Sequence, residues 1–191
     1  MRVLVVNHIT LDGVFQGPGR SDEDTRHDFQ HGGWAQRGAA DPAIGSAVGE
    51  RMGQGFSWLF GRRSYEGMLS HWNEVGGPFK DGLNHPQKYV ATSKPDSDLP
   101  WPNSTPLSGD VPAAVAALRE RPGGNLVIMG SGQLVRSLLP LGLVDEMFLM
   151  IHPVVLGSGE RLFGPADDRV ALTLVDSAIA STGVVMATYR P

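Results

Sequence analysis

Hydrophobic and polar positions along the chain group into short blocks that switch between strand-like and helix-like spacing. Short apolar runs, typical of strands covered on both faces, lie at residues 3–6, 57–61, 87–93 and 125–130. Apolar residues at helical spacing lie between and after these runs, over residues 42–52, 62–72, 111–121 and 132–142. This alternation predicts an α/β fold with a mostly parallel central sheet.

The last part of the chain carries a different pattern. Residues 144–157 predict a long strand that Pro153 limits or bends, because proline cannot donate to a sheet ladder. Residues 170–179 and 183–191 then predict a closing antiparallel pair. The predicted sheet is therefore mixed, with antiparallel strands at its C-terminal end.

Two local sequence signals mark a turn and a helix start between these blocks. Thr10-Leu11-Asp12-Gly13 predicts a turn, and Asp41-Pro42 predicts a helix start with aspartate as N-cap and proline as the first helical residue. The segment between them, residues 16–38, is glycine-rich and polar, and residues 21–31 within it suggest a helix capped by Ser21 or Asp22. We expect this segment to be a long functional loop.

Composition narrows the class of protein. The chain has 191 residues, a formal net charge of -4 and no cysteine. The charge argues against a nucleic-acid partner, and the lack of cysteine excludes disulfides and thiolate chemistry. No apolar run approaches the roughly 20 residues of a membrane span. The N-terminus has the pattern of a buried strand and not of a signal peptide, so we expect a cytoplasmic protein.

Three predicted strands end in residues suited to an anion. The junctions are Gly61-Arg62-Arg63-Ser64, Thr92-Ser93-Lys94 and Gly130-Ser131-Gly132-Gln133-Leu134. Free helix N–H groups and cationic side chains attract anions, and ligands of α/β sheets bind at the carboxyl ends of strands. A tight turn without a ligand also explains the Gly-Ser-Gly, and Val135 replaces the third glycine of a dinucleotide fingerprint.

The order "LDG … GRRSYE … YVATSKP … IMGSGQLVRSLLPLGLVDEMFLMIHPVVLGSGERLF" resembles the dihydrofolate reductase-like superfamily. It is most similar to the reductase domain at the C-terminus of the bifunctional riboflavin-biosynthesis deaminase–reductase, in its stand-alone form. The resemblance covers nearly the whole chain, and residues 130–163 are its most specific part. It implies one domain over residues 1–191, a three-layer αβα architecture and a homodimer.

The resemblance also implies an NADPH-dependent reductase. It places Gly61, Arg62, Arg63 and Ser64 against the cofactor phosphates, and Thr92, Ser93 and Lys94 at the adenosine ribose and its 2′-phosphate. Gly130, Ser131, Gly132, Gln133 and Leu134 take the pyrophosphate at a helix N-terminus, where glycines let the backbone approach. The basic residues favour NADP over NAD, because an extra phosphate must be neutralised.

The chain departs from the family at the substrate. The acid that holds the pterin in dihydrofolate reductases falls at about Gly45, and the glutamate of the riboflavin-type domain is Met129 here. The implied substrate is a small planar heterocycle, by family default a pyrimidinone of the 5-amino-6-(5-phosphoribosylamino)uracil type. Folate reduction and a non-catalytic nucleotide- or flavin-binding module are the alternatives. The catalytic residue and proton donor are not identified.

Three residues are candidates for substrate contact, each with a structural alternative. Asp12 is a turn residue or faces the nicotinamide pocket; Trp34 walls a planar substrate or anchors a local core; Asp41 touches substrate or only caps its helix. His27 and His31 have the i, i+4 spacing of a metal pair on one helix face. No third ligand supports a metal there, so none is predicted.

Overall fold

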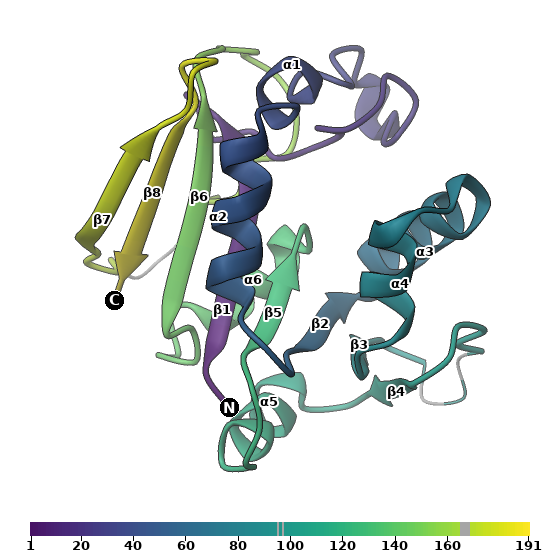
Figure 1. The fold of residues 1–191 in the computed structure, drawn as a ribbon. Helices are drawn as coiled ribbons and strands as arrows, with labels where there is room; N and C mark the ends of the chain where they lie inside the picture. The colour runs from purple at the N-terminus through teal and green to yellow at the C-terminus, as the bar shows by residue number, and fades with distance from the viewer. Residues whose placement is uncertain (95, 97, 165–168) are drawn as a thin grey trace.

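The computed structural model describes residues 1–94, 96, 98–164 and 169–191. One eight-stranded sheet forms the centre, in the order β4-β3-β2-β5-β1-β6-β8-β7 (Figure 1). Its strands are β1 (Val3–Thr10), β2 (Ser57–Gly61), β3 (Lys88–Ala91), β4 (Ser104–Leu107), β5 (Leu126–Met129), β6 (Glu146–His152), β7 (Thr173–Ile179) and β8 (Val185–Arg190). Strands β1 to β6 pair in parallel, and β8 pairs antiparallel to both β6 and β7. The predicted mixed α/β sheet is confirmed.

Helices cover both faces of the sheet, as the three-layer prediction requires (Figure 1). They are α1 (Gln36–Ala39), α2 (Pro42–Met52), α3 (Arg62–Val75), α4 (Pro78–Asn84), α5 (Val111–Arg119) and α6 (Gly132–Leu138), with a 3-10 turn, η1, at Arg26–Asp28. One core packs α5 and α6 on the sheet, and the other packs α2, α3 and α4 on the opposite face. Alternate residues of β1 enter the two cores: Val3 and Val5 face α5 and α6, whereas Leu4 and Val6 face α2 and α3.

Most predicted elements appear close to their expected places, and the differences have local causes. Strand β1 continues beyond residue 6 to Thr10, because it pairs in parallel with β6 along this whole length. The short elements α4 and β4 were not predicted. Strand β4 carries only half-exposed and exposed positions, so it lacks the apolar run by which a buried strand is found.

The predicted helix over residues 21–31 is wrong. Of this segment only η1 is helical, and within it His27 has φ 55° and ψ 34°, which breaks a regular helix. Asp28 also has a positive φ of 57°. Side chains and carbonyls of the loop bond to one another and to Glu160, and these contacts replace helical hydrogen bonds. His27 and His31 therefore do not share a helix face.

Candidate functional site

The three predicted junctions lie along one edge of the sheet. Strands β3, β2 and β5 are neighbours and run parallel, so their carboxyl ends open on the same side. Strand β1 continues this edge beside β5. The fold therefore brings together residues that are up to 73 positions apart between Gly61 and Leu134.

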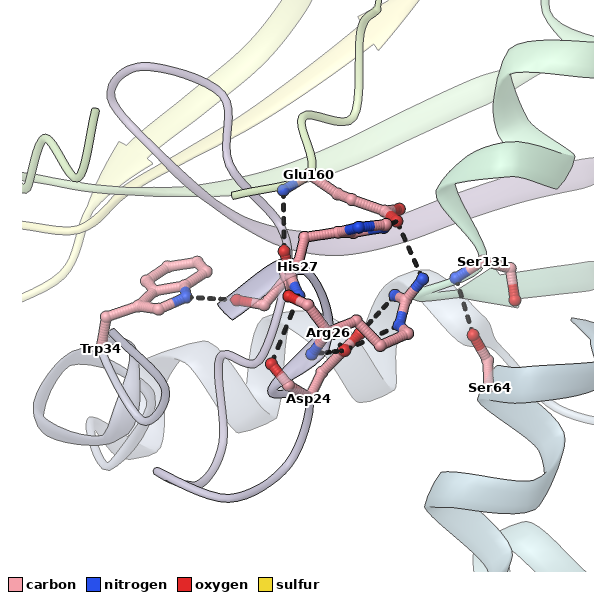
Figure 2. Close-up of polar contacts among 8 residues, drawn as sticks. Asp24, Arg26, His27, Trp34, Ser64, Ser131 and Glu160 are labelled. Carbon is pink, nitrogen blue, oxygen red and sulfur yellow. Dashed lines mark hydrogen bonds and ion pairs between the residues drawn. The ribbon is translucent and has the colours of Figure 1, made fainter. Parts of the chain in front are cut away.

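Hydrogen bonds join the ends of β2 and β5 and the side chain of Asn7 in β1 into one polar ledge. The N–H of Gly61 donates to Oγ of Ser131 at 2.9 Å, and the N–H of Ser131 donates to Oγ of Ser64 at 2.9 Å (Figure 2). Asn7 at the same edge bonds Gly130 twice, accepting from its N–H at 2.6 Å and donating to its carbonyl at 3.1 Å. We call Asn7, Gly61, Ser64, Gly130 and Ser131 the strand-end ledge.

Both glycines of the Gly-Ser-Gly are explained by the turn itself. Gly130 has a φ of +66°, a conformation that glycine adopts at little cost. At Gly132 a Cβ would lie 2.4 Å from the ring of Phe15, so only glycine leaves room for that ring. Their role in letting the backbone approach a diphosphate stays a prediction.

The two arginines at the start of α3 have different surroundings. Arg62 donates from Nε to Glu66 at 2.6 Å, one helical turn later, whereas Arg63 is exposed. Nη1 of Arg62 is buried and has no hydrogen-bond partner among the described residues. A buried unpaired donor of this kind costs about 1–3 kcal/mol, more when it is charged. An anion at the start of α3 would satisfy it.

The third junction follows β3 directly. Thr92 continues the pairing of β3 with β4 through its N–H, and the N–H of Lys94 donates to Oγ1 of Thr92 at 3.1 Å. Ser93 and Lys94 are exposed. Hydroxyls and an ammonium therefore stand at the outer end of the same sheet edge, next to the junction on β2.

Asp12 lies in the predicted turn, where the N–H of Gly13 donates to the carbonyl of Thr10 at 2.9 Å. Its carboxylate accepts from the Thr10 hydroxyl at 2.6 Å and from the N–H groups of Leu156 and Gly157 at 3.2 and 2.9 Å. The bond from Thr10, joined by those from the two backbone N–H groups, lowers the pKa of Asp12 to about 2. Asp12 thus fastens the turn after β1 to the loop after β6, and its contact with substrate stays a prediction.

Asp41 is the N-cap of α2, as predicted. One carboxylate oxygen accepts from the N–H of Ala43 at 3.0 Å, and the other accepts from the N–H and hydroxyl of Ser181 at 2.8 and 2.7 Å. The Ser181 hydroxyl, followed by the N–H of Ala43, lowers the pKa of Asp41. Both oxygens are therefore engaged within the protein. Substrate contact by Asp41 stays a prediction.

Trp34 anchors the long loop against the sheet edge. Its Nε1–H donates to the carbonyl of Gln16 at 2.7 Å (Figure 2), and its ring meets that of His152 edge-on at 5.2 Å. Trp34 is half-buried, so part of the indole stays accessible to solvent. The structure thus shows the anchoring contacts, and the role of a substrate wall stays a prediction.

Arg26 holds the same loop at a second point. Figure 2 shows its guanidinium between Asp24 and Glu160, donating to Glu160 at 2.8 Å and to Asp24 at 2.8 Å through Nε. Gln16 adds two contacts, donating to the Arg26 carbonyl and accepting from the N–H of Glu160. His27, exposed beside this network, lies 3.7 Å from Glu160. No cluster of three or more metal-binding side chains occurs among the described residues.

Sequence reasoning did not single out a pair of histidines at the ends of β1 and β6. Nδ1 of His8 and Nε2 of His152 are 2.8 Å apart and share a hydrogen bond. Burial, and then the proximity of His152, lower the pKa of His8 to about 4, and burial lowers the pKa of His152. The available signal was a histidine in each of two largely apolar strands, "VLVVNHIT" and "EMFLMIH".

The two positions where the family carries an acid have different surroundings. Gly45 lies on the exposed side of α2, with nothing within 4 Å of a Cβ built on it. Met129 is half-buried at the end of β5 and packs on the core beneath α2 and α3. On that face of the sheet, His8 lies two residues beyond Val6, the register partner of Met129, and is hydrogen-bonded to His152.

Sequence comparisons give one family and two curated relatives. The family model of the RibD C-terminal domain matches residues 2–186. Uncharacterized protein YyaP of Bacillus subtilis (strain 168) is 28% identical over 193 residues, covering 99% of this chain and 94% of YyaP. Uncharacterized protein YwjB of the same organism is 34% identical over 86 residues, covering 45% of this chain and 49% of YwjB.

Solved structures share the fold over nearly the full chain. A putative riboflavin biosynthesis protein from Shewanella sp. PV-4 has a TM-score of 0.70 at 18% identity, covering 100% of this chain and 98% of its own. Dihydrofolate reductase from Enterococcus faecalis, complexed with NADP(H), has a TM-score of 0.60 at 16% sequence identity. The match covers 99% of this chain and 95% of the reductase. A pyrimidine reductase-like protein from Corynebacterium diphtheriae has a TM-score of 0.60 at 15% sequence identity. The match covers 99% of this chain and 91% of that protein's chain. The dihydrofolate reductase-like fold predicted from the sequence is confirmed.

Proposed function

The chain belongs to the RibD C-terminal domain family, and from this premise we propose that it is an NADPH-dependent reductase of a small planar heterocycle. The observation that carries the proposal is the buried, unpartnered Nη1 of Arg62 at the start of α3, beside the strand-end ledge. A phosphate group is the anion that the family would bring to this position. The dihydrofolate reductase of the same fold was solved with NADP(H).

The residues present fit such a cofactor by their chemistry. Arg62, Arg63 and Ser64 would hold its phosphates, and Thr92, Ser93 and Lys94 would hold the adenosine ribose with its 2′-phosphate. Residues 130–134 would hold the pyrophosphate. When bound, NADPH would supply the hydride, while the protein supplies position and electrostatics. Cationic side chains at two of the three strand ends favour the extra phosphate of NADP.

The substrate class follows from the family. Its default is a pyrimidinone of the 5-amino-6-(5-phosphoribosylamino)uracil type, and two solved neighbours are a putative riboflavin biosynthesis protein and a pyrimidine reductase-like protein. The folate alternative has less support, because the helix position for its acid is the exposed Gly45. We propose that the protein acts as a homodimer. None of the described helices is long and apolar enough to span a membrane.

The test is a fluorescence titration with NADPH and NADH on the wild type, on Arg62→Ala/Arg63→Ala and on Arg121→Ala. Arg121 is an exposed arginine at the far end of α5, so its variant controls for loss of positive charge. We expect tighter binding of NADPH than of NADH, and a loss of that preference only in the double variant.

Binding of neither nucleotide by the wild type would contradict the reductase proposal. A yellow protein on purification would instead indicate a tightly bound flavin. If NADPH binds, its oxidation with the pyrimidinone or with 7,8-dihydrofolate identifies the substrate class, and sedimentation velocity of the same sample tests the homodimer.

A further inference from the structure

The helices that cover β1 leave one of its side chains incompletely buried. Among the eight residues of β1, seven are buried and His8 alone is half-buried. His8 shares its face with Leu4 and Val6, because alternate residues of a strand point the same way. Those two residues belong to the core beneath α2 and α3, so the opening lies on that face of the sheet.

The neighbouring strand β5 is also incompletely covered, at the position beside this one. Met129 is the half-exposed residue of β5, and its register partner on β1 is Val6, two residues before His8 on the same face. Next to Met129 along the chain begins the strand-end ledge, with Gly130 bonded to Asn7. His8 therefore stands directly beside the place where the proposed cofactor and substrate would meet.

The imidazole of His8 has one nitrogen fixed and one available. Nδ1 shares the 2.8 Å hydrogen bond with Nε2 of His152, whereas Nε2 of His8 has no hydrogen bond to any residue in the described ranges. His152 is itself held in place: Trp34 packs edge-on against its ring, and a Cβ on Gly38 would lie 2.6 Å from its Cε1 and Nδ1. This packing fixes the direction in which His8 can point.

We propose that His8 donates the proton of the reduction, and that His152 is the positioning residue that orients His8 and sets its tautomer. The inference rests on the proposed function. It supplies the acid that the chain lacks at Met129 and Gly45.

The carbon of a C=N or C=O bond in the substrate accepts the hydride, and the π-electron pair of that bond moves onto the nitrogen or oxygen. This atom takes the proton from Nε2 of His8. His152 begins the step protonated on both ring nitrogens, and its Nε2 proton moves to Nδ1 of His8. The histidine pair goes from singly charged to neutral and regains one proton from solvent.

The groups around His8 leave His152 as its main titrating partner. Met129 and Met150 on the adjacent strands, with Trp34 and Gly38 on the covering segment, carry no charge. Asp41 at the start of α2 is turned to Ser181 and Ala43. The pair should therefore titrate as one unit, with an apparent pKa that belongs to both rings.

The first readout is the nitrogen NMR spectrum of the wild-type protein with labelled histidine, recorded with and without NADPH. We expect saturating NADPH to move the Nε2 resonance of His8, while that of the exposed His85 on the far side of β3 stays in place. Without NADPH, the resonances of His8 and His152 should change together as the pH is lowered. This readout needs no variant to fold.

The second readout is NADPH oxidation with 7,8-dihydrofolate and with the phosphoribosylamino-uracil, in His8→Gln, His152→Gln and the control His85→Gln. We expect His8→Gln to lower kcat about 10²- to 10⁴-fold without weakening NADPH binding. Because an acid must be protonated, wild-type kcat should fall as the pH rises through the midpoint of the pair, and this dependence should be absent in His8→Gln. His152→Gln should shift the midpoint.

Two results would overturn the inference and leave the proposed function standing. One is NADPH binding that does not move the His8 resonance. The other is a His8→Gln variant with the kcat and pH profile of the wild type. Failure of the wild type to bind NADPH would instead count against the proposed function itself.

Discussion

At Gly132, the absence of a side chain leaves space that another residue fills at the sheet edge. The ring of Phe15, in the segment after β1, occupies the space where a Cβ of residue 132 would stand, with ring carbons at 2.4 and 2.5 Å. Gly132 is buried and lies in α6, so its value comes from this contact and not from a left-handed backbone. A packed ring cannot be moved at low cost.

We therefore expect Gly132→Ala to lower the free energy of unfolding by about 1–3 kcal/mol, through overpacking against Phe15. The matched control is Gly45→Ala, also within a helix but with open space around its Cβ. Alanine there should raise stability by up to about 1 kcal/mol. Urea unfolding of both variants measures the difference, and equal effects would show that Phe15 yields to the new methyl.

At the scale of elements, the loop of residues 16–38 is held by side chains in place of regular structure. Arg26 joins it to Glu160 in the loop after β6, and Gln16 spans the same two segments. Trp34 and His152 form a second attachment. The loop lies over the carboxyl edge of the sheet, so its anchoring sets access to the candidate site (Figure 1).

Replacing Arg26 by methionine should free this loop, because Asp24 and Glu160 then lose their common cation. We expect Arg26→Met to be cleaved faster between residues 16 and 38 in limited proteolysis with an endoprotease for acidic residues. Arg20→Met is the control, since the one ion pair of Arg20 among the described residues is with the exposed Asp22 of the same loop. Cleavage of Arg26→Met at the rate of the control would mean that Trp34 alone anchors the loop.

At the scale of the whole molecule, acid should weaken the fold in two separate pH ranges. The pKa of His8 is about 4 in the folded protein and 6.5 for a free histidine, so the unfolded chain binds the extra proton first. Stability due to neutral His8 is complete above pH 6.5 and is lost as the pH falls toward 4. Asp12, with a folded pKa of about 2 against 3.8, adds a loss at lower pH.

We expect the free energy of unfolding of the wild type to fall by up to about 3 kcal/mol from His8 between pH 6.5 and 4. His8→Gln should lack this part of the pH dependence, and Asp12→Asn should lack the part between pH 3.8 and 2. Urea unfolding at a series of pH values measures both, with His85→Gln as control. An unchanged slope in His8→Gln would show that folding leaves the pKa of His8 at its unfolded value.

How much the sequence predicts depends on whether its signals are local. Asp41-Pro42 defines the start of α2 because capping acts within a few residues, and the run at 57–61 defines β2 to the residue because both of its faces are buried. The helix expected over residues 21–31 fails for the opposite reason. Ser21 and Asp22 cap none of the described helices, and the contact of Arg26 with Glu160, far along the chain, prevails over a weak helical preference.

The sequence by itself determined the α/β class, the family and the three anion-suited strand ends, because periodicity, capping and motif order are written along the chain. Only the tertiary structure decided that these ends adjoin, that Ser131 bonds both Gly61 and Ser64, and that His8 meets His152 across two strands. These contacts join residues 67 to 144 positions apart. They follow from the order of the strands in the sheet, and no local sequence pattern predicts which strands become neighbours.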